Sequence, residues 1–134
     1  MKAKVFTTTS NTSCRKAIDW LDEYEIPYEE KNLSNTPITV EEIQEILSLT
    51  NEGTEEIISK KTGVIKKLKI DIETLSLPQL YEVITNNPGM LHLPIIHDGR
   101  KLQVGYNDEE IRQFLPRWFR VDQFKNLFNQ SKTV

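Results

Sequence analysis

The stretch Val-Phe-Thr-Thr-Thr-Ser-Asn-Thr-Ser-Cys-Arg-Lys-Ala, residues 5–17, decides the fold. Val5 and Phe6, followed by a run of threonines, favour an extended strand. Residues 10–13 all carry small polar side chains that can accept a hydrogen bond from a free N–H group at the start of a helix. The stretch therefore predicts a short strand, a polar loop and a helix with Cys14 in or near its first turn.

Two interpretations of Cys14 remain open at this point. The partial positive charge of a helix start, together with Arg15 and Lys16, favours a reactive thiolate. Alternatively, Cys14 is a small buried residue between helix and sheet, which is common for free cysteines. A strand, a polar loop and a helix-start cysteine form a thioredoxin-like layout, which usually has a second cysteine three residues earlier. Asn11 stands there, so the loop cannot form an internal disulfide.

Composition limits the class of protein. The chain has 134 residues, 37% hydrophobic and 28% charged, which predicts one soluble globular domain. No apolar run approaches the length of a membrane helix, and a single cysteine excludes an internal disulfide framework, so we expect a cytoplasmic protein. A net charge of −3 gives no general attraction to nucleic acid, and any DNA contact requires a local basic patch.

The first third of the chain predicts a βαβ unit. Apolar residues at helical spacing follow Cys14 and end before Pro27, and residues 27–33 then show a strand pattern. Two strands joined by one helix and short connections are expected to be parallel, with a right-handed crossover.

A helical block is predicted next. Thr39 and Glu42 form a capping-box pattern, and Ser76 is expected to cap a helix over 77–86. A turn at 51–54 is expected to let Thr54 cap a short helix over 55–59. The first helix is expected to bury one apolar face, made of Val40, Ile43, Ile46 and Leu47.

The basic residues of the chain are densest between 60 and 69. Lys60 and Lys61 open this run. A charge run is usually a solvated helix face, and contact with phosphates is the other interpretation.

Strand signals return near residue 93. Residues 93–97 and 101–105 are predicted to be paired strands, and Asp98-Gly99 is typical of a type I′ hairpin turn. Asn107 is expected to cap a helix over 108–114. Pro94 either starts an edge strand or is the proline, often cis, that faces the cysteine loop in thioredoxin-like proteins.

These elements predict an α/β fold of the thioredoxin-like type, which the family resemblance given below narrows to the arsenate reductase type. A mixed four-stranded sheet takes two strands from the N-terminal third and two from the hairpin. We expect a single domain over 1–134, with a helical insert at about 38–88 and a C-terminal tail at about 117–134.

The sequence offers little for other chemistry. His92 and His97 do not have zinc-site spacing, and His97 is expected at a surface or rim. No glycine-rich phosphate loop appears and no catalytic Ser/His/Asp set can be placed. We expect no metal and no cofactor.

Several segments carry a family resemblance. Thr12-Ser13-Cys14-Arg15-Lys16-Ala17 resembles the cysteine loop shared by thioredoxin-like arsenate reductases and the Spx regulators of low-GC Gram-positive bacteria. The later segments favour Spx, and they follow the order of that family over nearly the whole chain. They are residues 52–59, 87–91, 94–96 and 102–117.

The resemblance implies a transcription regulator rather than an enzyme. Spx proteins bind the C-terminal domain of the RNA polymerase α subunit and redirect polymerase to stress promoters. By resemblance, Gly53 belongs to the α-binding surface. Lys60 and Lys61 are implicated in contact with promoter DNA, which occurs only in the polymerase complex. The ClpXP protease and its adaptor are further implied partners.

Two departures from the family pattern affect function. Asn11 replaces the first cysteine of the redox motif, so we expect no internal disulfide switch. Leu93 stands where arsenate reductases have an arginine that holds the oxyanion. The alternative function is a monothiol arsenate reductase-like oxidoreductase with Cys14 as nucleophile. A third is a thioredoxin-like adaptor without polymerase contact.

Overall fold

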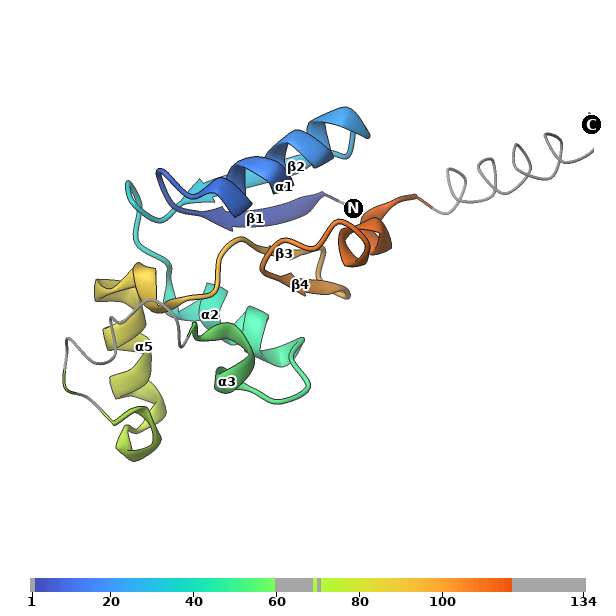
Figure 1. The fold of residues 1–134 in the computed structure, drawn as a ribbon. Helices are drawn as coiled ribbons and strands as arrows, with labels where there is room; N and C mark the ends of the chain where they lie inside the picture. Colours follow the sequence, from blue (N-terminus) through green and yellow to red (C-terminus); the bar gives the residue numbers. More distant parts are fainter. Residues whose placement is uncertain (1, 60–68, 70, 117–134) are drawn as a thin grey trace, which may run out of the picture.

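A computed structural model describes residues 2–59, 69 and 71–116 as a four-stranded sheet between helices (Figure 1). The strands lie in the order β2-β1-β3-β4. β1 pairs in parallel with β2 and antiparallel with β3, and β3 pairs antiparallel with β4. Their bounds are Ala3–Thr7 for β1, Tyr28–Asn32 for β2, Ile95–His97 for β3 and Leu102–Val104 for β4. The predicted α/β class with a mixed sheet is confirmed.

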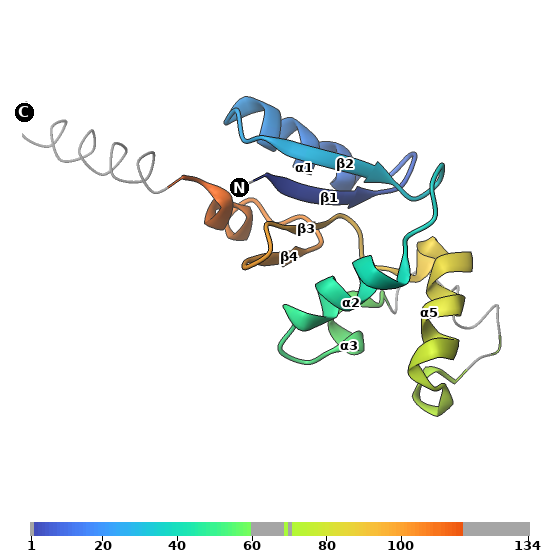
Figure 2. The same ribbon diagram turned by 180° about the vertical axis from the view of Figure 1, so that it is seen from behind.

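One face of the sheet is covered by α1 (Thr12–Glu23), the crossover helix between β1 and β2 (Figure 2). Its inward residues pack on alternate residues of β1 and β3, because successive side chains of a strand point to opposite faces. The buried cluster on this face includes Ala3, Val5, Ala17, Trp20, Leu21, Ile96 and Ile111. The predicted parallel βαβ unit is confirmed.

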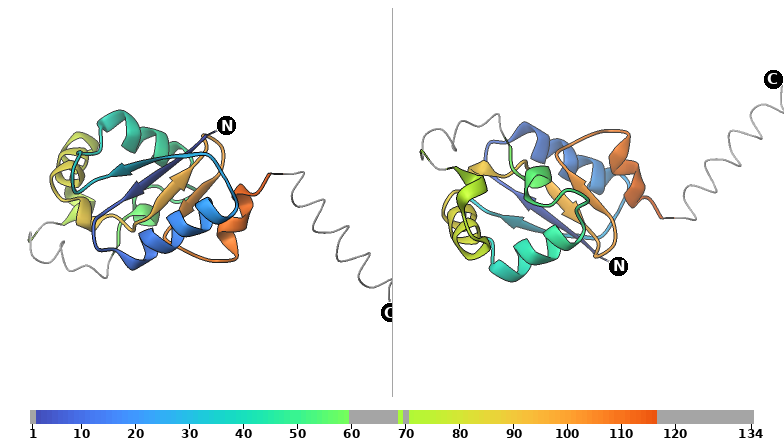
Figure 3. Two further views of the ribbon diagram at one scale, coloured as in Figure 1. Left: turned by 90° about the horizontal axis from the view of Figure 1, so that it is seen from above. Right: turned by 90° about the horizontal axis from the view of Figure 1, so that it is seen from below.

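The opposite face carries α2 (Val40–Ser48), α3 (Thr54–Ile57) and α5 (Leu77–Asn86). In the view from above, α1 lies in front of the sheet (Figure 3). In the view from below, α2 and α3 lie in front of it. The buried cluster there includes Phe6, Ile43, Ile46, Ile57, Leu80, Ile84 and Ile95. A fully buried side chain of this size contributes roughly 1.5–3 kcal/mol to stability.

The predicted caps of this helical block are partly confirmed. Thr39 starts α2 and Ser76 starts α5, each with a complete capping box. The prediction for Thr54 is wrong: Gly53 holds the N-cap position, and the helix already ends at Ile57 because Ile58 is extended. Val40 was also wrongly predicted to face inward; it is 42% exposed in the first turn of α2.

The hairpin forms as predicted, but its turn type was wrong. A type I′ turn needs two consecutive residues with positive φ, and in this turn only Gly99 has one, at 89°. The side chain of Asp98 stabilises the turn instead, because its Oδ1 accepts hydrogen bonds from the amides of Arg100 and Lys101 at 3.0 and 2.8 Å. His97 was wrongly placed at the rim. It is 1% exposed, because α2 covers this face of β3.

Short 3₁₀ helices complete the described chain. They are η1 (Ile72–Thr74), η2 (Pro88–Met90) and η3 (Glu110–Phe114). η3 replaces the longer helix predicted over 108–114. The predicted N-cap at Asn107 is wrong, because Glu109 holds the N-cap position of η3. Asn107 stabilises the turn before η3, where its Oδ1 accepts hydrogen bonds from the amides of Glu109 and Glu110 at 2.9 and 3.0 Å.

Parts of the predicted organisation lie outside the described residues, among them Lys60, Lys61 and the tail at 117–134. The division into one domain with an insert and a tail therefore stays a prediction. Among the residues that the structure describes, no helix is long and apolar enough to cross a membrane.

Candidate functional site

The cysteine loop is built by the end of β1 and the start of α1. Asn11 is the N-cap of α1, and its Oδ1 accepts a hydrogen bond from the amide of Cys14 at 3.0 Å. Ser10, just before it, has a positive φ of 62°, a conformation that few residues other than glycine adopt. Asn11 therefore acts as the helix cap three residues before Cys14.

Cys14 has the properties of the second sequence interpretation, a small buried residue between helix and sheet. Its side chain is buried, with 3% of the residue exposed. Burial raises the pKa of the Cys14 thiol, and the charge of Glu30 raises it further, while a backbone hydrogen bond from Thr8 lowers it less. Of the two sequence interpretations, the buried residue is supported and the reactive thiolate is not, because desolvation of a charged sulfur outweighs the favourable end of the helix.

A cavity of about 240 Å³ opens beside the thiol. Glu30 accepts a 2.7 Å hydrogen bond from Thr7 Oγ1 at its wall, and Asp19 adds a second carboxylate. Two carboxylates beside one guanidinium, that of Arg15, disfavour an oxyanion such as arsenate. The lining residues are Thr7, Thr8, Thr9, Ser10, Cys14, Arg15, Ile18, Asp19, Glu30 and Asn32.

Pro94 follows a cis peptide bond with Leu93, as one of the two sequence interpretations required. Leu93 is 6% exposed and packs in the core cluster that also contains Cys14. An apolar side chain therefore precedes the cis bond, and Leu93 brings no charge to the core around Cys14.

Gly53 lies on the other face of the sheet, at the start of α3 (Figure 1). Its φ is 77°, which suits glycine, and a Cβ placed on it would meet no atom within 4 Å. The turn is held by the Gly53 amide, which donates to Thr50 Oγ1 at 3.1 Å. Glu56 Oε2 also accepts from the amides of Asn51 and Glu52 at 2.9 and 3.2 Å. The structure thus brings Asn11 and Cys14 together and keeps Gly53 apart from them, with its backbone open to close approach.

Sequence reasoning missed a second cavity, of about 620 Å³, next to β4. It joins residues that are distant in sequence, so no local pattern could reveal it. Its lining residues are Glu56, His92, Leu102, Gln103, Val104, Glu109, Glu110 and Gln113. Glu110 Oε2 and the carbonyl oxygen of Gly105 accept from buried Gln103, at 3.3 and 3.1 Å.

The same region explains the specific motif at 102–117. Gln113 Nε2 donates to Gln103 Oε1 at 3.1 Å and to the carbonyl oxygen of Leu102 at 3.3 Å. Gly105 has a positive φ of 74°, and a Cβ there would lie 2.7 Å from His92 Nε2. The motif therefore encodes a buried amide network and a close backbone contact that locks η3 to the sheet.

Comparison with known proteins decides the family. The ArsC family matches residues 6–114. The chain belongs to the ArsC family. Within it, the chain is 50% identical over 121 residues to the global transcriptional regulator Spx of Listeria innocua, covering 90% of this chain and 92% of that protein. The Spx protein of Staphylococcus aureus strain Mu50 gives the same identity and coverage. The suspected membership of the Spx group is thereby shown.

Solved structures support the same fold. An ArsC-family-related protein from Bacteroides fragilis superposes with a TM-score of 0.73 at 23% identity, covering 85% of this chain and 98% of that one. Arsenate reductase from Vibrio cholerae gives a TM-score of 0.66 at 18% identity, covering 86% and 96%. At these identities the likeness concerns the fold alone, and it confirms the thioredoxin-like, arsenate reductase type.

Proposed function

We propose that this chain is an Spx-type transcriptional regulator that binds the C-terminal domain of the RNA polymerase α subunit and alters promoter use under stress. It acts in the cytoplasm and contacts promoter DNA only within the polymerase complex. The identity of 50% to proteins named as global transcriptional regulators supports the role of regulator. The Gly53 turn supports the partner surface.

The Gly53 turn is the observation that carries the proposal. Its backbone is held by hydrogen bonds from within the turn, so its conformation exists before any partner arrives. Open space above the glycine allows another backbone or an aromatic ring to approach closely. A preformed surface limits the entropy lost on binding.

An enzymatic role has less support. A buried thiol with a raised pKa is a poor nucleophile at neutral pH. The cavity beside it carries two carboxylates, and Leu93 supplies no charge for an oxyanion. We therefore propose that the chain is a regulator and not an arsenate reductase-like oxidoreductase.

The proposal is tested by calorimetric titration of the purified α C-terminal domain into wild type and Gly53→Arg. We expect binding in the wild type and none in Gly53→Arg, because a long charged side chain blocks close approach. Gly53→Ala serves as the matched control: it carries the same strain at positive φ but adds only a methyl group, so it should keep more affinity. Equal affinity of Gly53→Arg and wild type would remove Gly53 from the partner surface.

A further inference from the structure

His97 is a buried titratable group that the proposed function does not use. It lies on β3, opposite Lys4 of β1 and Leu102 of β4, on the sheet face that α2 covers. Its ring stacks on Phe6 with centroids 6.0 Å apart and planes at 18°. Only 1% of the residue is exposed.

The hydrogen bonds of His97 fix its protonation state. The amide of Gly99 donates to Nδ1 at 3.2 Å, so Nδ1 carries no proton and the neutral ring has its proton on Nε2. Nε2 is buried and has no hydrogen-bond partner among the described residues. A buried donor without a partner is costly, and neutral His97 is therefore satisfied at only one of its two nitrogens.

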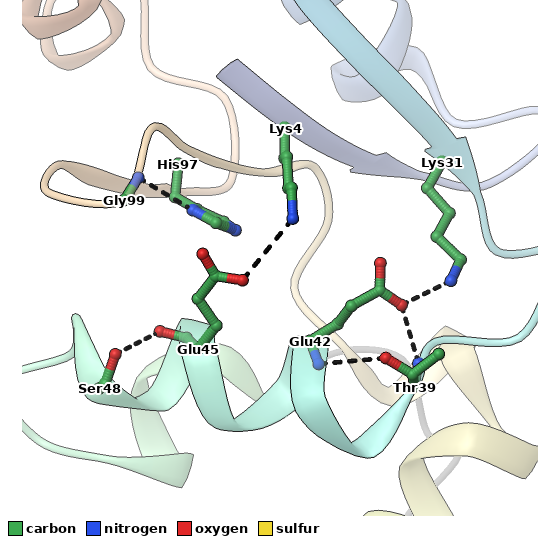
Figure 4. Close-up of polar contacts among 8 residues, drawn as sticks. All are labelled: Lys4, Lys31, Thr39, Glu42, Glu45, Ser48, His97 and Gly99. Carbon is green, nitrogen blue, oxygen red and sulfur yellow. Dashed lines mark hydrogen bonds and ion pairs between the residues drawn. The ribbon is translucent and has the colours of Figure 1, made fainter. Parts of the chain in front are cut away.

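Four charged side chains act on the ring. Glu45 and Glu42 come from α2, Lys4 comes from β1, and Asp98 comes from the hairpin turn. Burial is the largest influence on the pKa of His97 and lowers it. The positive charge of Lys4 lowers it further, whereas the negative charges of Glu45, Asp98 and Glu42 raise it. Glu45 extends from α2 toward His97 and Lys4 (Figure 4).

The contact between Glu45 and Lys4 is weak enough to be exchanged. Lys4 Nζ and Glu45 Oε2 are 3.7 Å apart, and the two side chains are 45% and 43% exposed. Partly exposed pairs at such a distance contribute little, about 0–1 kcal/mol. Glu45 can therefore leave Lys4 for a cation on the buried ring of His97, which is less screened by water than the partly exposed ammonium group of Lys4.

We propose that His97 is a proton-operated link between the β3–β4 turn and α2. A proton from solvent adds to the lone pair of Nδ1, and the Gly99 amide loses its acceptor. The imidazolium then donates from Nε2 to the carboxylate of Glu45, which leaves Lys4. One proton thus loosens the turn and draws α2 toward β3.

The position of α2 gives this link a route to the partner surface. α2 ends at Ser48 and leads into the turn that contains Gly53. The amide of Gly53 donates a hydrogen bond to Thr50 Oγ1. The effect on α-subunit binding rests on the proposed function. The link itself needs no partner, so the experiment below tests it even if the chain does not bind polymerase.

The experiment is an NMR titration of the full chain with acid, following the ring signals of His97. The chain has two histidines, and His92→Gln assigns the signals. We expect the Gly99 amide, the Glu45 carboxyl carbon and the Lys4 ammonium group to move with the same midpoint as the ring. In His97→Gln these three signals should not share a transition.

Two substitutions should move the midpoint in opposite directions. Glu45→Gln should lower it, because the imidazolium loses the negative charge beside it, and Lys4→Met should raise it, because a repelling cation is removed and Glu45 is freed. Glu41→Gln, an exposed carboxylate on the same helix, and Lys2→Met, an exposed lysine beside β1, are the matched controls and should leave it unchanged.

Three outcomes would overturn the link. One is a Glu45 signal that does not follow the His97 ring. The second is a midpoint that Glu45→Gln and Lys4→Met move no more than the controls do. The third is unfolding of the whole domain before the His97 signals shift.

Discussion

At the scale of single residues, Asn11 and Cys14 determine how the chain can respond to oxidants. A disulfide needs two sulfurs within bonding reach, and the chain has only one cysteine, of which 3% is exposed. Oxidation of Cys14 can give only a sulfenic acid or a disulfide to another molecule, and its raised pKa leaves little thiolate to start either.

We therefore predict that the chain works without a thiol switch. Binding to the α C-terminal domain should be nearly the same before and after mild diamide treatment, and Cys14→Ser should keep most of the regulatory activity. Both are measured by calorimetry and by polymerase-dependent transcription from a responsive promoter. A large gain on oxidation that disappears in Cys14→Ser would show that one thiol suffices.

Asn11→Cys is the matched control for this prediction. It restores a two-thiol motif in the same loop, and oxidation should then close a disulfide that is detectable by mass. The variant also loses the hydrogen bond that the Cys14 amide donates to Asn11 Oδ1, which should lower the free energy of unfolding by about 1 kcal/mol in the reduced protein.

At the scale of elements, α2 and α5 both begin with a capping box, but the third helical residue is charged in α2 and neutral in α5. Thr39 pairs with Glu42 at the start of α2, and Ser76 pairs with Gln79 at the start of α5. Burial by itself raises the pKa of Glu42, but hydrogen bonds from Lys31 and Thr39 outweigh it and leave the pKa below 4.5. The stabilisation from ionised Glu42 is complete above pH 4.5 and is lost as the pH falls through the folded-state pKa.

The two caps should consequently respond differently to pH. Thr39→Ala and Ser76→Ala should each lower the free energy of unfolding by about 1 kcal/mol at neutral pH. Urea unfolding below pH 4.5 should give a smaller loss of unfolding free energy for Thr39→Ala, because the hydrogen bond of the Thr39 side chain favours ionised Glu42 and protonated Glu42 no longer gains from it. The loss for Ser76→Ala should stay constant, because Gln79 does not titrate. A parallel decline in both variants would contradict this account.

At the scale of the whole molecule, charge governs contact with DNA. A net charge of −3 means that the chain as a whole is repelled by phosphates. We predict that charge reversal at Lys60 and Lys61 weakens promoter binding by the polymerase complex and makes that binding less dependent on salt. Binding to the α subunit should not change. Footprinting over a salt series measures this.

Charge reversal at Lys2 and Lys16 is the matched control, because both lysines are exposed and carry the same charge elsewhere on the surface. That variant should leave the footprint of the complex as it is in the wild type. If charge reversal at Lys60 and Lys61 also left the footprint unchanged, these lysines would not contact DNA and would only be exposed to solvent.

The success of sequence reasoning followed the range of the interactions. The caps at Thr39 and Ser76 were predictable, because they depend on neighbours within a few residues. The βαβ unit was predictable because each of its elements has a local pattern and because short connections leave few ways to pair the two strands. The burial of His97 was missed because it depends on α2, about fifty residues away in sequence. The sequence could not decide between the buried and the reactive interpretation of Cys14 for the same reason, since its desolvation comes from tertiary packing that no local pattern contains.

The sheet order has a consequence for self-association. β2 is one open edge, and it carries Glu29, Glu30 and Lys31 in succession. Charged side chains of both signs on an edge strand oppose its pairing with a strand of another copy. The opposite edge, β4, is only three residues long, and the carbonyl oxygen of Leu102 already accepts a hydrogen bond from Gln113 Nε2. Both edges are thus protected against growth into intermolecular sheets, and association with other proteins is left to the helices and turns.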